Sequence, residues 1–148
     1  MTHGAAVLYL DTSALLKAFI AEEGTAEVRA WMQAADVHAS SGITALEIAS
    51  ALARLSREGA TKAAIAKAHA GFEAAWKDFA QVEVDEVLGQ AARLVSKHPL
   101  RSLDAIHLAS ALRIQSSGHD IEFACSDDRL SAAARVEGLK VLPPIMMK

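Results

Sequence analysis

Short, continuously apolar runs alternate along this chain with longer segments whose apolar residues recur at helical spacing. The run Ala6–Leu10 has no polar alternation, which is typical of a strand covered on both faces. Thr44–Glu58 instead carries an apolar stripe that predicts a helix, ended by Gly59. Further strands are expected at 37–40, 81–84, 121–125 and 140–142. Further helices are expected at 13–21, 25–35, 61–79, 86–97, 102–115 and 129–136.

The alternation of strands and helices predicts an α/β fold in which a parallel central sheet is flanked by helices on both faces. The helical pair at about 44–79 has no strand between its members and is interpreted as an insertion. The 148 residues are expected to form a single domain, 1–148, with a short C-terminal tail at 143–148. In such sheets the working site lies beyond the carboxyl ends of the strands.

Composition narrows the possible functions. A chain that is 52% hydrophobic and 22% charged is globular rather than disordered. The formal net charge of −3 gives no long-range attraction to a polyanion, so binding of nucleic acid would depend on local geometry. Because Cys125 is the lone cysteine, a disulfide framework and a multi-cysteine zinc site are excluded. We expect Cys125 to be a small buried side chain. No secretory signal or membrane-spanning run is visible, which favours a soluble cytoplasmic protein.

Acidic residues stand where strands or loops give way to helices. Asp11 directly follows the first apolar run, Glu47 and Asp104 lie in the first turns of two expected helices, and Asp127 and Asp128 follow the strand at 121–125. Helix capping would account for each of them separately, and Thr44-Ala45-Leu46-Glu47 fits a capping box.

Capping explains these acids less well when they are considered together, because Asp11 and Asp104 are flanked by residues that favour burial. A buried lone carboxylate costs several kcal/mol or becomes protonated, and converging carboxylates repel each other. A divalent cation would remove both conflicts. Oxygen ligands without a histidine or thiolate pattern favour Mg²⁺ or Mn²⁺, and such a site suits phosphoryl chemistry.

Four segments carry a resemblance to a known family: "YLDTSALLKAF", "TALEIASALAR", "LRSLDAIHLASAL" and "FACSDDRLSAAARVEGLKVLPP". Together they resemble the PIN-domain ribonucleases, specifically the VapC-type toxins of toxin–antitoxin pairs. The resemblance implies that Asp11, Glu47, Asp104 and Asp127 form the acidic site. Its spacing selects Asp127, two residues before Arg-Leu, rather than Asp128. Cys125 departs from the family, which often has threonine or serine at that place.

The resemblance implies an Mg²⁺- or Mn²⁺-dependent endoribonuclease in which Asp11 and Asp104 bind the metal directly, while Glu47 and Asp127 bind it directly or through water. Ser13 and Ser102 would hold the carboxylates in position, with helix capping as the alternative. Candidate phosphate contacts are Lys17 and Arg54, which would otherwise be solvated surface cations. His107, one turn after Asp104, could face the pocket or be a satisfied core or surface histidine.

The family also implies partners: an RNA substrate, a cognate VapB-type antitoxin that covers the acidic pocket, and a homodimer, with DNA contacted only through the antitoxin. A housekeeping PIN-fold nuclease is the first alternative. A haloacid-dehalogenase-type phosphatase would need a second acid at Ser13. A receiver domain phosphorylated on aspartate would need paired acids after the first strand, which offers Asp11 alone.

Overall fold

The computed structural model describes residues 6–144 and contains a five-stranded sheet in which all neighbouring strands are parallel. In spatial order the strands are β3 (Ala80–Val82), β2 (Val37–Ser41), β1 (Val7–Leu10), β4 (Ile121–Ala124) and β5 (Lys140–Leu142). The helices are α1 (Thr12–Leu16), α2 (Thr25–Ala34), α3 (Thr44–Arg57), α4 (Lys62–Trp76), α5 (Leu88–Lys97), α6 (Ser102–Ser116) and α7 (Asp128–Val136). The predicted α/β class is therefore confirmed. Residues 145–148 of the predicted tail lie outside the described part of the chain.

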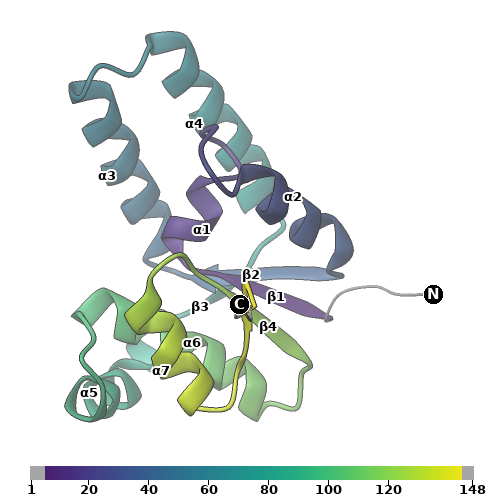
Figure 1. Cartoon of the computed structure of the whole chain (residues 1–148), viewed down its shortest axis with the longest axis vertical. Helices are drawn as coiled ribbons and strands as arrows, with labels where there is room; N and C mark the ends of the chain where they lie inside the picture. The colour runs from purple at the N-terminus through teal and green to yellow at the C-terminus, as the bar shows by residue number, and fades with distance from the viewer. Residues whose placement is uncertain (1–5, 145–148) are drawn as a thin grey trace, which may run out of the picture.

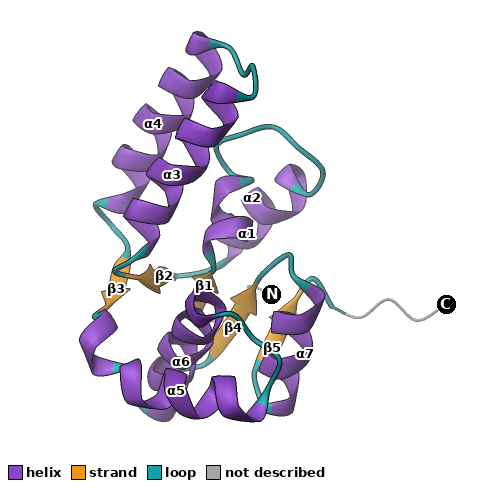
Figure 2. Cartoon of the chain, turned by 90° about the vertical axis from the view of Figure 1, so that its left-hand side faces the viewer, coloured by secondary structure: helices purple, strands orange, loops and turns teal. Residues whose placement is uncertain are grey.

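The sheet lies between two helical layers, with α1–α4 on one face and α5–α7 on the other (Figures 1 and 2). Alternate residues of β1 supply the two cores, as the strand period of two requires. Leu8 and Leu10 pack among the buried residues of α1–α4, whereas Val7 and Tyr9 pack among those of α5–α7. All four are buried, so the continuous apolar run is explained by a strand that is covered on both faces.

Strand β1 occupies the centre of the sheet, between β2 and β4. Because all strands are parallel, their carboxyl ends lie at one edge, and the segments that follow β1, β2 and β4 begin there. The amide of Asp11 donates to the carbonyl of Ala124 over 3.0 Å, which joins the end of β1 to the end of β4. This arrangement brings segments that are more than a hundred residues apart in the sequence to one edge.

The helix expected at 13–21 is shorter than predicted and ends at Leu16. The amides of Lys17, Ala18 and Phe19 bond carbonyls three residues back instead of four, so the α-helical ladder has already ended there. Beyond this turn, Arg29 donates two hydrogen bonds to the Ala18 carbonyl, at 3.2 and 3.0 Å. The amide of Glu22, which would have bonded that carbonyl in a continued helix, donates to the hydroxyl of Thr25 instead. The chain therefore turns toward α2.

Other element bounds differ less from the predictions. The helix expected at 61–79 spans Lys62–Trp76 with Thr61 as its N-cap, and the helix expected at 86–97 begins at Leu88 after a 3₁₀ turn, η1 (Val84–Glu86). Cys125 is buried, as predicted. Among the described residues, no helix combines the length and the apolar character that crossing a membrane would require.

Candidate active site

A groove of about 870 Å³ opens at the edge of the sheet where the parallel strands end. Its wall is formed by residues from the segment after β1, from α3, from the start of α6 and from the loop before α7. All the candidate site residues identified from the sequence line it: Asp11, Ser13, Lys17, Glu47, Arg54, Ser102, Asp104, His107 and Asp127. The fold thus brings together side chains that are distributed over the chain, while their roles remain predictions.

Asp11 is the most buried acid of the groove, with 4% of its surface exposed. It is the N-cap of α1, and its Oδ1 accepts a hydrogen bond from the Ala14 amide at 2.9 Å. The Ser13 hydroxyl lies 2.8 and 3.0 Å from the two carboxylate oxygens. Burial raises the pKa of Asp11 to about 6 despite these donors and the nearby His107. The same residue therefore caps a helix and presents a carboxyl with a raised pKa to the groove.

Glu47 does not form the capping box that its sequence spacing suggests. The N-cap of α3 is Ile43, and the hydroxyl of Thr44 is 2.7 Å from that of Ser40, so neither partner of the expected box is available. Instead, Glu47 Oε1 accepts a hydrogen bond from Thr12 Oγ1 at 2.6 Å and lies 2.8 Å from His107 Nε2. The side chain consequently points from α3 toward the start of α1 and toward α6.

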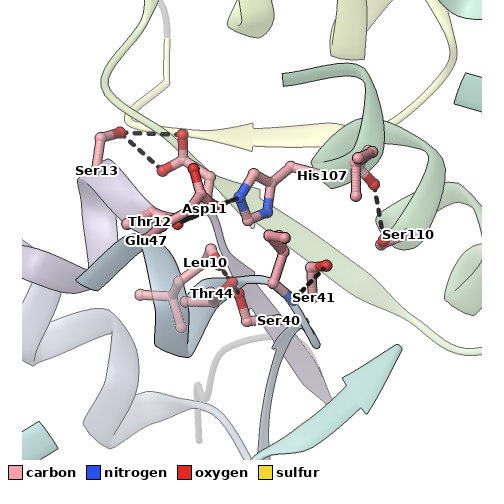
Figure 3. A network of polar contacts seen from close by, with 12 residues as sticks. Leu10, Asp11, Thr12, Ser13, Ser40, Ser41, Thr44, Glu47, His107 and Ser110 are labelled. Atoms are coloured by element: carbon pink, nitrogen blue, oxygen red, sulfur yellow. Dashed lines mark hydrogen bonds and ion pairs between the residues drawn. The ribbon is translucent and has the colours of Figure 1, made fainter. Parts of the chain in front are cut away.

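His107, for which the sequence allowed either a place facing the pocket or a satisfied core or surface position, lies at the centre of this network (Figure 3). It is 2% exposed, with Nδ1 at 2.8 Å from the Tyr9 hydroxyl and Nε2 within reach of both Glu47 and Thr12. Burial alone would raise the pKa of Glu47, but the contacts with His107 and Thr12 outweigh it and hold the pKa below its usual value. The histidine is thus a satisfied buried residue that also contacts the acidic groove.

Tyr9 and Thr12 are participants that sequence reasoning missed. Thr12 directly follows Asp11 and could have been noticed as a hydroxyl beside the first acid. Tyr9 stands inside an apolar strand, where only its hydroxyl distinguishes it from core residues. Nothing in the local sequence indicates that its partner is 98 residues away.

Asp104 and Asp127 form the more open end of the groove. The pKa of Asp104 is raised mainly by burial and, second, by repulsion from the charge of Asp127. Asp127 is exposed and caps α7 by accepting a hydrogen bond from the Leu130 amide at 3.0 Å. Asp128 is the first residue of α7 and lines a smaller neighbouring hollow, not the groove itself. Position therefore favours Asp127 over Asp128 as the fourth acid, as the sequence spacing does.

The two serines proposed to support the carboxylates differ. Ser13 contacts both oxygens of Asp11, and its hydroxyl also accepts a hydrogen bond from the Ser126 amide at 3.3 Å, which links α1 to the loop before α7. Within residues 6–144, the Ser102 hydroxyl has no hydrogen-bond partner, and the N-cap of α6 is Arg101. The geometry supports a positioning role for Ser13 and gives none to Ser102.

The two cations proposed to contact phosphate also differ. Lys17 Nζ lies 2.7 Å from Glu22 Oε1 and 3.0 Å from the Glu23 carbonyl, so its charge is already compensated within the protein. Arg54 is exposed on α3, and within the described part of the chain its one ion pair is a long contact of 3.9 Å to Glu58. Arg54 is therefore the freer of the two for an external anion.

The donor set of the groove fits a hard divalent cation by its chemistry, because it consists of carboxylate and hydroxyl oxygens and includes two acids with raised pKa values. The described residues contain no group of three histidine, cysteine or acidic side chains already close enough to hold a metal ion. Mg²⁺ commonly binds through one or two carboxylates and retains several waters. The groove fits that open mode rather than a closed protein cage.

Comparison with known proteins gives consistent results. The model of the family described as "PIN domain" matches residues 8–136. The chain is 33% identical over 139 residues to Ribonuclease VapC45 and to Ribonuclease VapC49 of Mycobacterium tuberculosis, covering 93% of this chain and 95% of each relative. It is 32% identical over 140 residues to Ribonuclease VapC46 of the same species, covering 94% and 98%. The crystal structure of PAE2754 from Pyrobaculum aerophilum matches in fold, with a TM-score of 0.58, 22% identity and coverage of 96% of this chain and 88% of that one.

Proposed function

Because this chain belongs to the PIN-domain family, within its VapC ribonuclease group, we propose that it is a divalent-metal-dependent endoribonuclease and the toxin of a type II toxin–antitoxin pair. The observation that carries the proposal is the groove in which Asp11, Glu47, Asp104 and Asp127 meet. Family membership disfavours the phosphatase and receiver alternatives. A housekeeping role remains the competing use of the same site.

In this proposal Asp11 and Asp104 bind Mg²⁺ or Mn²⁺ directly, and Glu47 and Asp127 bind it directly or through water. When bound, such a cation acts as a Lewis acid toward phosphate and lowers the pKa of a coordinated water. The remaining contributions come from the protein. Ser13 orients the Asp11 carboxylate, while α1, α3, α6 and α7 present the acids from separate rigid elements.

RNA would approach from the open side of the groove. The protein has a net charge of −3, so attraction of the phosphate backbone depends on local cations at the rim. Arg54 is exposed along α3 and is the better phosphate candidate, whereas Lys17 would first have to leave Glu22. We therefore retain both residues as candidate contacts and rank Arg54 above Lys17.

The partner would be a cognate VapB-type antitoxin. Apolar residues share the groove wall with the acids, and among them Leu46 and Leu103 are exposed. A segment with apolar side chains and a cationic residue would complement this combination of apolar wall and carboxylates. We propose that such a segment of the antitoxin covers the groove, that the toxin forms a homodimer and that it acts in the cytoplasm.

The central test is cleavage of a defined RNA by the purified protein in Mg²⁺ or Mn²⁺ and in EDTA. The change Asp104→Asn removes one proposed ligand, and we expect cleavage to fall about a hundredfold, because losing even a group that supports a ligand typically costs about ten- to a hundredfold. The charge-matched control is Asp36→Asn, because Asp36 lines a separate hollow at the opposite end of the strands. Cleavage in EDTA, or full activity of Asp104→Asn, would contradict the proposal.

Expression in cells separates the toxin from the housekeeping role. If the protein is a toxin, induction arrests growth, co-expression of the neighbouring antitoxin gene restores it, and Asp104→Asn does not arrest growth. Sequencing of RNA ends in cells expressing the wild type and Asp11→Asn would identify the cleaved RNA. Growth unaffected by the active enzyme would favour the housekeeping alternative.

A further inference from the structure

The network around Glu47 assigns its two carboxylate oxygens to different roles. Oε1 accepts a hydrogen bond from Thr12 at 2.6 Å and faces His107 Nε2 at 2.8 Å. No residue of the described chain forms a hydrogen bond with Oε2. One oxygen is therefore engaged by the protein, while the other remains available to the groove.

The orientation of the His107 ring is fixed from its other side. Nδ1 lies 2.8 Å from the hydroxyl of Tyr9, which is fully buried in β1 and stacks on Phe123 at 5.5 Å between ring centroids. When the tyrosine hydroxyl donates to Nδ1, the neutral imidazole carries its proton on Nε2, directed at Glu47. Two donors, Thr12 and His107, then converge on Oε1.

From this geometry we propose that Tyr9, His107 and Thr12 form a positioning device that holds Glu47 by Oε1, so that Glu47 meets a divalent cation or a coordinated water through Oε2 alone. The inference rests on the proposed metal-dependent function and adds residues to it. His107 is a positioning residue, because it is buried behind Glu47 and acts through it. Partners of this kind that orient ligands commonly change metal affinity ten- to a hundredfold when removed.

The alternative is that the network only stabilises the fold. A second histidine–glutamate contact in the chain provides the matched control, since His98 Nε2 lies 2.7 Å from Glu137 Oε2 outside the groove. Both contacts join a buried or half-buried histidine to a glutamate. A purely structural role predicts that His98→Leu and His107→Leu lower stability and leave metal affinity alone.

The experiment measures the dissociation constant for Mn²⁺ by electron paramagnetic resonance of the free ion, at one pH, with folding checked by circular dichroism. We expect His107→Leu to weaken Mn²⁺ binding about tenfold, and His107→Gln, whose amide nitrogen can replace Nε2–H, to restore affinity to within about threefold. His98→Leu should bind Mn²⁺ like the wild type. Wild-type affinity of folded His107→Leu would overturn the proposal.

A double-mutant cycle tests whether His107 acts through Glu47. In the Glu47→Ala background, His107→Leu should cause no further loss of Mn²⁺ affinity, and an undiminished tenfold loss there would overturn the proposal. Tyr9→Phe keeps the ring packing and removes only the hydroxyl, so it serves if His107→Leu does not fold. We expect it to weaken Mn²⁺ binding several-fold, and unchanged affinity would count against the device.

The failures of the two proposals are distinguishable. If the wild type binds Mn²⁺ in the manner described but cleaves no RNA, the proposed function fails and the positioning role stands. If RNA is cleaved in a metal-dependent reaction while His107 and Tyr9 variants bind Mn²⁺ normally, the positioning role fails and the proposed function stands.

Discussion

The buried carboxyl of Asp11 makes the stability of the metal-free protein depend on pH in a defined direction. Its pKa is raised from the usual 3.8 to about 6, first of all by burial. Between these values the folded protein holds a proton that the unfolded chain releases. The stability contributed by protonated Asp11 is therefore fully present below about pH 4 and is lost as the pH rises through about 6.

The magnitude follows from the size of the change in pKa. It corresponds to about 3 kcal/mol in the free energy of unfolding, because one pH unit is worth about 1.4 kcal/mol. Asp11→Asn removes this titration while keeping an oxygen that can accept from the Ala14 amide. Because the unfolded carboxyl is already partly ionised at pH 4, the free energy of unfolding of the variant minus that of the wild type should increase by about 2 kcal/mol of this total between pH 4 and pH 7.

Urea unfolding monitored by circular dichroism, in EDTA at pH 4, 5, 6 and 7, measures this difference directly. Comparing pH dependences cancels any pH-independent cost of the substitution itself. Asp36→Asn serves as the control, because Asp36 is exposed and away from the groove, and its curve should parallel that of the wild type. A constant difference between Asp11→Asn and the wild type across this pH range would refute the reasoning that Asp11 titrates as a buried acid.

Two further predictions concern the core and the cysteine. Leu52→Ala should lower the free energy of unfolding by about 3 kcal/mol, because Leu52 is fully buried on α3. Leu46→Ala on the same helix, at a site that is 67% exposed, should change it by less than about 0.5 kcal/mol. Urea unfolding measures both variants, and equal losses would contradict the assigned burial. Burial, reinforced by the nearby charge of Asp11, raises the pKa of the Cys125 thiol to about 12. Iodoacetamide at pH 8 should therefore leave Cys125 unmodified in the native protein and alkylate it in urea. Mass spectrometry measures the modification, and rapid labelling of the native protein would contradict the prediction by showing that the thiol is accessible.

The sheet and its acidic edge could be predicted because their signals are local. A strand covered on both faces reads as an unbroken apolar run, and Asp11 stands out immediately after it. Asp104 is likewise conspicuous in the first turn of a largely buried helix. The prediction of the sheet and the prediction of its acidic edge therefore need only a few neighbouring residues and the rule that parallel strands end at the same edge.

The features that could not be predicted depend on contacts between distant segments. The turn that follows α1 is held by Arg29, which lies on the next helix and donates to the Ala18 carbonyl. The capping box at Thr44 fails because Ser40, at the end of β2, is near its hydroxyl. In each case the local pattern allows more than one hydrogen-bond partner, and the tertiary fold selects among them.

The electrostatics of the groove distinguish Asp11 and Asp104 from Glu47. Asp11 and Asp104 have raised pKa values, and burial is the largest cause for both, whereas the hydrogen-bond donors around Glu47 keep its pKa low. Near pH 6 Asp11 is protonated in about half of the molecules, and there an incoming cation has to displace the proton, whereas the lowered pKa of Glu47 keeps that carboxylate ionised. The positioning network thus keeps Glu47 ionised and able to attract a cation, while burial makes Asp11, one of the two proposed direct ligands, ionise fully only at higher pH or when a cation is bound.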